Sequence, residues 1–340
     1  MANMPALLIT FSIFGTIEVK EYIHNLLSIM KRRKFVHTAG LGLAAITVPI
    51  GEITRQGLTG TPVRNSGLTA GDLNKYLRTL AAVKEPSVDR IVIGDPGTVV
   101  KKIGTAWMPY LETLKEAVAA GVNVLVVHEP TFYTHWDLDG WKEEKLSIPD
   151  TAQVKYEELI QSKKQWIEEK GMVIIRCHDV WDKFPGTGIP FALGQALGFS
   201  EEDIIRNETY YNVYKTSPVP AAEMARRIAA ALAPAGQPGV AFYGNEKYTV
   251  GSVGVGTGCI CDPRQFMNLD PDLFIAIDDS IMTWTQTTFA RDTGRPLVVI
   301  NHGTSEEFGM LTLNKQLKSA FPGHEVIHFS EGCTYKWITG

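Results

Sequence analysis

The chain has 340 residues and a mass of 37.5 kDa, enough for two domains of average size or for one large domain. Its 44% hydrophobic and 21% charged residues exclude a collagen-like, low-complexity or wholly disordered chain. A net charge of -4 and four cysteines argue against a general nucleic-acid-binding protein and against a disulfide scaffold.

The first part of the chain has the pattern of a leader. Met30 opens a basic segment, and an apolar stretch from Ala39 to Ile50 follows it, as in a secretory signal. One residue separates the pair Arg32–Arg33 from Phe35, which is typical of a bacterial twin-arginine signal. A basic surface turn beside a buried helix is the alternative interpretation. We expect an upstream extension over 1–29, a signal over 30–55 and a linker over 56–67.

This leader predicts export by the twin-arginine route to a periplasmic or other extracytoplasmic location, with a cytoplasmic location as the alternative. The apolar run from Pro5 to Ile17 is shorter than the about 20 residues of a membrane-spanning helix. We therefore expect no membrane span in the mature protein.

From Leu68 onward, predicted helices and strands alternate. Helices are predicted over Leu68–Val83, Tyr110–Ala120, Tyr156–Lys170, Pro220–Leu232 and Ser305–Phe321, and strands over Arg90–Ile93, Val122–Val127, Met172–Ile175, Val250–Val255, Leu273–Ile277, Leu297–Ile300 and Val326–Phe329. The strands are continuous Val and Ile runs, which indicates burial on both faces, so the pattern predicts an α/β fold. Thr304 and Glu307 match a capping box for the last helix. The segment Thr134–Thr151 reads as a long loop, either a lid or an interface.

Three of these strands run into a histidine that is followed by a carboxylate. The clusters are His128 with Glu129, His178 with Asp179 and Asp182, and His302 with Glu306. Ligands in open α/β sheets bind at the carboxyl ends of the strands, so the three clusters could meet in one crevice. Imidazole and carboxylate together suit divalent transition metals, and Glu306 is placed to bridge two of them. The alternative is that each histidine is structural.

The same segments resemble the motifs of the Nif-three-like (Ngg-one-interacting-factor-three-like) dinuclear-metal family, also described as GTP cyclohydrolase I type 2 homologues. The family motif H-H-P-x-x-F corresponds to His128–Tyr133, H-T-N-x-D-x-x-x-G to His178–Gly186, and G-H-x-x-[ST]-E to Asn301–Glu306. A weaker match covers the glycine-rich turn Val253–Gly258. The resemblance extends from about Leu68 to Phe329.

The resemblance implies an α/β domain over 68–330, with two similar halves that meet at about 205–215 and a tail over 331–340. It implies mixed, largely buried sheets with a metal site in the crevice between them. Two divalent ions per subunit, zinc, iron or manganese, would be held by five residues, with a sixth as a catalytic candidate beside the metals. The implied ligands are His128, Glu129, Asp182, His302 and Glu306, and the catalytic candidate is His178. A ring-shaped homohexamer is also implied.

Glu129 departs from the family pattern, because it stands where the motif has a second histidine. A carboxylate there favours harder metals such as manganese or iron over zinc, or leaves one metal position weak. The turn Gly254–Gly258 reads as a tight turn or as a phosphate cradle. The predicted function is metal-dependent hydrolysis of a nucleotide or phosphoester-like small molecule. A non-catalytic metal-binding scaffold or interaction protein is the alternative.

Overall fold

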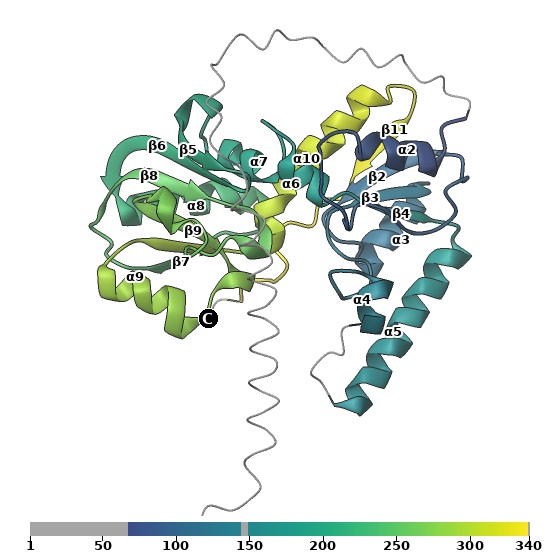
Figure 1. Cartoon of the computed structure of the whole chain (residues 1–340), viewed down its shortest axis with the longest axis horizontal. Coiled ribbons are helices and arrows are strands. Elements are labelled where there is room, and N and C mark those ends of the chain that lie inside the picture. Colours follow the sequence, from purple (N-terminus) through teal and green to yellow (C-terminus); the bar gives the residue numbers. More distant parts are fainter. Residues whose placement is uncertain (1–66, 144–148, 339–340) are drawn as a thin grey trace, which may run out of the picture. The chain divides into compact units, whose positions relative to one another are not determined.

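The computed structural model describes residues 67–143 and 149–338. Apart from Gly67, the expected extension, signal and linker over 1–67 lie outside the described residues. Within the two described ranges, none of the helices combines the length and the apolar composition that a bilayer crossing requires. The described residues contain two sheets and the helices that cover them (Figure 1).

The first sheet has five strands in the order β1-β4-β3-β2-β11. These strands are β1 (Ile91–Ile93), β2 (Lys102–Ala106), β3 (Val124–Val127), β4 (Val173–Arg176) and β11 (Glu325–His328). All pair in parallel except β1, which is antiparallel to β4. Helices α3 (Leu111–Ala119) and α5 (Asp150–Glu169) cover one face, and α2 (Ala70–Leu77) and α10 (His302–Ala320) cover the other. Burial on both faces accounts for the continuous apolar strands.

The second sheet has six strands in the order β5-β6-β8-β9-β10-β7. Its strands are β5 (Ile204–Glu208), β6 (Tyr211–Pro220), β7 (Ala241–Tyr243), β8 (Thr249–Val255), β9 (Leu273–Ile277) and β10 (Leu297–Ile300). The pairs β8–β9 and β9–β10 are parallel, and the other three pairs of this sheet are antiparallel. Helices α7 (Ile189–Ala196), α8 (Ala221–Leu232) and α9 (Thr288–Thr293) contribute side chains to its core. Two mixed sheets with covering helices confirm the predicted α/β class.

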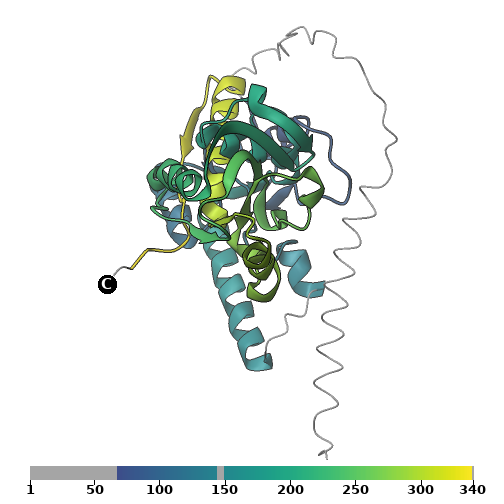
Figure 2. The same cartoon turned by 90° about the vertical axis from the view of Figure 1, so that its left-hand side faces the viewer.

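Helix α10 connects the two sheets. It begins directly after β10 of the second sheet, and its residues Met310, Leu313 and Leu317 are buried in the core of the first sheet. Strand β11 then pairs with β2, so the chain returns to the first sheet at its end. Figures 1 and 2 show α10 in yellow, with its first turn beside the second sheet. Its first turn is therefore positioned by both sheets.

Several strands do not appear in the predicted pattern. The strands β2, β5 and β6 carry Gly, Thr, Asn, Lys or Pro among their apolar residues, so they lack the continuous apolar run that signals a buried strand. Strand β7 has only three residues, too few to show a pattern. Segment Thr134–Thr151 is less of a loop than predicted, because it contains α4 (Leu138–Glu143) and the start of α5. Sequence patterns miss such short or polar elements because pairing partners, rather than local composition, stabilise them.

The start of α10 also differs from the prediction. Asn301 is the N-cap, since its side chain accepts a hydrogen bond from the backbone N–H of Thr304 at 3.3 Å, and the helix begins at His302. Glu307 does not close a capping box. Its carboxylate bonds the ring of His328 at 2.8 Å and accepts the backbone N–H of Gly332 at 3.2 Å. The earlier start places His302 and Glu306 in one helical stretch, four residues apart.

Candidate metal centre

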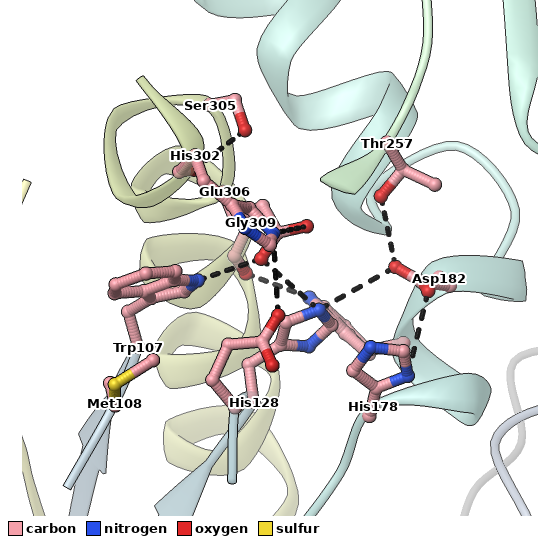
Figure 3. Close-up of polar contacts among 12 residues, drawn as sticks. Trp107, Met108, His128, His178, Asp182, Thr257, His302, Ser305, Glu306 and Gly309 are labelled. Atoms are coloured by element: carbon pink, nitrogen blue, oxygen red, sulfur yellow. Dashed lines mark hydrogen bonds and ion pairs between the residues drawn. The ribbon is translucent and has the colours of Figure 1, made fainter. Parts of the chain in front are cut away.

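The five predicted metal ligands meet in one place (Figure 3). They form two overlapping groups in which all ligand atoms lie within 4.8 Å of one another. The first group is His128, Asp182 and Glu306, and the second is Glu129, His302 and Glu306. The groups share Glu306, as expected for a bridging carboxylate. His178 belongs to a third group, with His128 and Glu129.

The sheets bring these residues together from distant parts of the chain. His128 and Glu129 directly follow β3, whereas Asp182 lies on α6 (Asp179–Lys183), which follows the neighbouring strand β4. His302 and Glu306 lie on the first turns of α10, after β10. The carboxyl ends of strands are the usual place for a ligand site in α/β sheets.

Glu306 bridges the two groups through its two oxygens. Its Oε2 lies 3.4 Å from His128 Nε2, and its Oε1 lies 3.2 Å from His302 Nε2. The carboxylate is buried, and the indole N–H of Trp107 donates to Oε2 at 2.7 Å. This hydrogen bond holds the carboxylate in the bridging orientation.

The hydrogen bonds of both histidines leave Nε2 free to bind a cation. His128 Nδ1 lies 3.2 Å from the Cys177 carbonyl oxygen, and His302 Nδ1 lies 2.8 Å from an Asp279 carboxylate oxygen. Both partners are acceptors, so in the neutral form of each ring Nδ1 carries the proton and Nε2 keeps its lone pair. Within the described part of the chain, neither buried Nε2 has a hydrogen-bond partner.

Each of these nitrogens instead faces carboxylate oxygens. His128 Nε2 lies 3.6 Å from Asp182 Oδ1 as well as 3.4 Å from Glu306 Oε2, and His302 Nε2 lies 3.3 Å from Glu129 Oε1. A lone pair against a carboxylate is repulsive unless a cation lies between them, and buried charge needs such compensation. Burial alone would lower the pKa of His302, but the Glu306 and Asp279 carboxylates raise it well above its ordinary value. The site therefore attracts positive charge, and its donor atoms fit divalent metals.

Glu129 is held by a buried arginine. Arg176 Nη2 lies 3.4 Å from Glu129 Oε2, and Arg176 Nε donates to the His128 carbonyl oxygen at 2.9 Å. Burial would raise the pKa of Glu129, but its close contact with the His302 ring and the charge of His178 lower it below the usual range. The carboxylate is thus held ionised and oriented toward His302, so Glu129 belongs to the cluster of candidate ligands in spite of its departure from the family motif.

Asp182 is held by the glycine-rich turn of the second sheet. Thr257 Oγ1 donates to Asp182 Oδ1 at 3.0 Å. The next residue, Gly258, has φ +46°, and a Cβ placed on it would lie 2.7 Å from Glu306 Oε1. Gly254 and Gly256 pack tightly against side chains of their own half, among them Phe266 and Tyr211. These contacts support the tight-turn interpretation and place the end of the turn against the metal ligands.

His178 lies beside the cluster and is partly exposed. Its ring stacks on that of His128, with centroids 4.4 Å apart, and its Nδ1 lies 2.9 Å from Asp179 Oδ1. Burial would lower its pKa, but Asp182 and the hydrogen bond to Asp179 raise it to about 9. The side chain keeps 18% of its surface exposed, so it can exchange a proton with a bound molecule or with solvent.

Four supporting residues are absent from the predicted site. They are Trp107, Arg176, Thr257 and Asp279. Trp107 follows β2, a strand that the apolar pattern does not reveal, and a lone Trp carries no motif. The others lie within or beside segments of the predicted pattern, but only their three-dimensional contacts show what they hold.

Comparison with known proteins finds a matching family and a relative of known name. The profile of the Duf34/NIF3 (NGG1p interacting factor 3) family matches residues 87–333. The chain is 33% identical over 124 residues to a protein of Chlamydia pneumoniae named GTP cyclohydrolase 1 type 2 homolog. That match covers 36% of this chain and 43% of the relative, so it spans less than half of the relative's length.

Solved structures of similar fold cover most of the chain. A hypothetical protein of Staphylococcus aureus aligns with a TM-score of 0.62 at 19% identity, over 79% of this chain and 99% of that one. A Bacillus cereus protein related to NIF3 aligns with a TM-score of 0.57 at 15% identity, over 79% and 99%. Reduced HcgD of Methanocaldococcus jannaschii aligns with a TM-score of 0.55 at 17% identity, over 77% and 97%. At these low sequence identities, the similarity to the solved structures supports the fold of this chain and nothing beyond the fold.

Proposed function

Because the chain belongs to the Duf34/NIF3 family, we propose that it binds two divalent metal ions and acts as a metal-dependent hydrolase on a nucleotide or phosphoester-like small molecule. The observation that carries the proposal is the buried Glu306 carboxylate, whose two oxygens face the bare Nε2 atoms of His128 and His302. The name of the Chlamydia pneumoniae relative, GTP cyclohydrolase 1 type 2 homolog, supports a hydrolytic reaction on a substrate of this class.

Each metal position would be built from one imidazole and two carboxylates. His128, Asp182 and Glu306 would hold one ion, and His302, Glu129 and Glu306 the other. Such ions supply Lewis acidity toward a carbonyl or phosphoryl oxygen and lower the pKa of water. Because oxygen ligands predominate, the donor set favours manganese or iron over zinc.

The surrounding residues would orient the ligands and move a proton. Trp107 and Asp279 fix the positions of Glu306 and His302, and Arg176 fixes Glu129. His178 would be the proton carrier, because Asp179 holds the proton on Nδ1 and leaves Nε2 to exchange one. Cations in the site would offset the carboxylates that raise its pKa to about 9, and would move that pKa toward neutrality.

A non-catalytic, metal-binding scaffold is the second candidate, and burial is the observation that favours it. The five candidate ligands are each at most 8% exposed, and metal sites without an open coordination position are structural rather than catalytic. We further propose, from the family resemblance and the leader pattern, a ring-shaped homohexamer and export by the twin-arginine route.

The first test is the metal content per subunit, measured by elemental mass spectrometry on full-length protein purified without a chelator. Wild type is expected to carry two ions, and Glu306→Gln is expected to lose both because the bridging charge is gone. Glu325→Gln is the matched control, since Glu325 is an exposed glutamate whose ion pair with Lys102 lies elsewhere on the surface. Unchanged metal content in Glu306→Gln would overturn the dinuclear site.

The second test separates the two candidate functions. The metal-loaded protein is assayed against nucleotides, phosphomonoesters and phosphodiesters, with His178→Gln as the variant. Turnover that falls in His178→Gln while its metal content stays at two supports the hydrolase. Two ions without turnover on the whole panel would leave the scaffold as the better account.

A further inference from the structure

An apolar pocket of about 570 Å³ lies beyond the carboxyl ends of β2 and β3. One wall contains Met108 and Pro130, and the opposite wall contains Leu159 and Trp166 of α5. Its volume lies within the range of about 300–1,000 Å³ found for small-molecule sites. We call it the α5 pocket.

The pocket adjoins the metal centre through the chain itself. Met108 directly follows Trp107, which bonds Glu306, and Pro130 directly follows Glu129. Figure 3 shows Met108 beside Trp107 at the edge of the cluster. Tyr110, another lining residue, has its ring 6.4 Å from that of Trp107, whose ring lies 5.3 Å from that of His302. A molecule in the pocket would therefore lie near the candidate ligands without displacing them.

One ammonium group is built into this apolar lining. Lys163 Nζ donates to the Thr131 carbonyl oxygen at 2.8 Å and lies 5.5 Å from the centroid of the Tyr133 ring. An ammonium has three N–H donors, so the carbonyl leaves donors for a bound molecule. Burial lowers the pKa of Lys163 to about 8, which leaves the group mostly charged at neutral pH. A cation within an apolar lining is complementary to an aromatic or apolar molecule with one anionic group.

The loop after β3, which contributes Thr131 and Tyr133 to the pocket lining, is held in place before any ligand binds. Asp137 Oδ1 accepts the backbone N–H groups of Thr131 at 2.6 Å and Phe132 at 3.0 Å. Tyr133 has φ +64°, an uncommon conformation for a residue with a side chain. Its ring is half exposed at the rim. Strained residues of this kind persist where the surroundings hold them, and they are frequent at ligand sites.

We propose that the α5 pocket binds the planar, apolar part of an anionic small molecule, that Lys163 holds its anionic group, and that the pocket thereby selects the substrate of the metal centre. This inference rests on the proposed hydrolase function and narrows its substrate class to aromatic anions, as opposed to small phosphoesters without an aromatic part. The partly exposed Leu159 and Tyr133 form the rim over which the molecule enters.

The test uses 4-(trifluoromethyl)benzenesulfonate as the probe, because it is flat and anionic and because sulfonates coordinate metals weakly. Binding to the full chain is followed by ¹⁹F NMR. Ser162→Trp fills the pocket, and Gln161→Trp places the same side chain on the next, exposed residue outside the lining. Lys163→Met removes the ammonium and keeps the stem, and Lys164→Met is its matched control, since Lys164 is paired with Glu168 on the surface of α5.

Saturable binding to wild type is expected, with loss in Ser162→Trp and at least about tenfold weakening in Lys163→Met, whereas both controls bind as wild type does. Equal binding in Ser162→Trp and Gln161→Trp would overturn the pocket. So would a wild-type protein that does not bind the probe, or a Ser162→Trp variant that changes only the oligomeric state, because a second copy would then be the occupant.

A second measurement ties the pocket to the metal centre. Bound Mn²⁺, counted by electron paramagnetic resonance, is expected to increase the ¹⁹F relaxation of the bound probe. Bound Mn²⁺ without added relaxation would mean that the pocket is not part of that centre. Probe binding in a protein that holds no metal would overturn the proposed function and the substrate role, and would leave a separate binding site.

Discussion

Gly258→Ala is expected to disrupt the metal centre without unfolding the protein. Gly258 has a left-handed φ of +46°, and an added Cβ would lie 2.7 Å from Glu306 Oε1 and 3.2 Å from His302 Nε2. Contacts below 3.0 Å are practically not seen for Cβ atoms. Glu306 cannot easily retreat, because it is buried and its other oxygen is bonded by Trp107. The methyl group therefore intrudes where the two metal positions meet.

The control separates this intrusion from backbone strain. Gly171 has a similar φ of +61°, and a Cβ there would meet nothing within 4 Å. Gly171→Ala should therefore cost only the left-handed strain, about 1–2 kcal/mol of unfolding free energy. Gly258→Ala should cost at least as much stability and should also weaken metal binding by about tenfold or more, since displaced supporting contacts alone cost about 10–100-fold.

Two assays check this prediction. Urea unfolding of both variants gives the strain, and isothermal titration with Mn²⁺ gives the affinity and the number of ions. The expected result is a loss of stability in Gly258→Ala at least as large as that in Gly171→Ala, and a loss of metal affinity in Gly258→Ala alone. If Gly258→Ala binds two ions with wild-type affinity, the ligand arrangement deduced for Glu306 and His302 is refuted.

Three further outcomes follow from the structure and the leader pattern. Trp107→Phe removes the N–H donor to Glu306 and should lower metal affinity about 10–100-fold in calorimetry; an unchanged affinity would mean that Glu306 needs no support. Burial raises the pKa of Glu331 from 4.5 to about 7, so the folded state binds the proton more tightly. The resulting contribution to the free energy of unfolding is present below pH 4.5 and is lost as the pH rises through 7, by at most about 3 kcal/mol. Glu331→Gln should remove this part of the pH dependence in urea unfolding measured across pH 4–8. Changing Arg32→Lys together with Arg33→Lys should retain the protein in the cytoplasm, and cell fractionation that finds unchanged export would contradict the signal.

The candidate ligands could be found from sequence because each follows a strand with an unmistakable pattern. The runs Val124–Val127 and Leu297–Ile300 are buried strands, and the histidines come directly after them. Strand direction then places each histidine at the carboxyl edge of its own sheet, His128 after β3 of the first sheet and His302 after β10 of the second. The motif resemblance supplied the choice of Asp182 over Asp179 as a ligand, which the local pattern alone leaves open.

The supporting contacts could not be found in this way, because they join segments that are far apart in the chain. Trp107 reaches Glu306 across 199 positions, and Thr257 reaches Asp182 across 75. Thr257 lies in the glycine-rich turn, but nothing in that turn indicates which residue it bonds. Trp107 lies in no motif, and β2, the strand before it, lacks the continuous apolar run by which a buried strand is recognised. The start of α10 differs from the prediction for a related reason. Asn301 caps the helix, and Glu307, the predicted partner of Thr304 in a capping box, bonds His328 instead.

The sequence by itself determined the α/β class and the positions of the strands with continuous apolar runs, because both depend on short-range patterns of apolar and polar residues. The set of candidate ligands came from these patterns together with the motif resemblance. Only the tertiary structure decided that α10 leaves one sheet to pack on the other, that Glu306 thereby faces both His128 and His302, and that Arg176 neutralises Glu129. These features depend on which side chains meet when two cores are packed together. Packing is a property of the whole fold, and no local window of residues contains it.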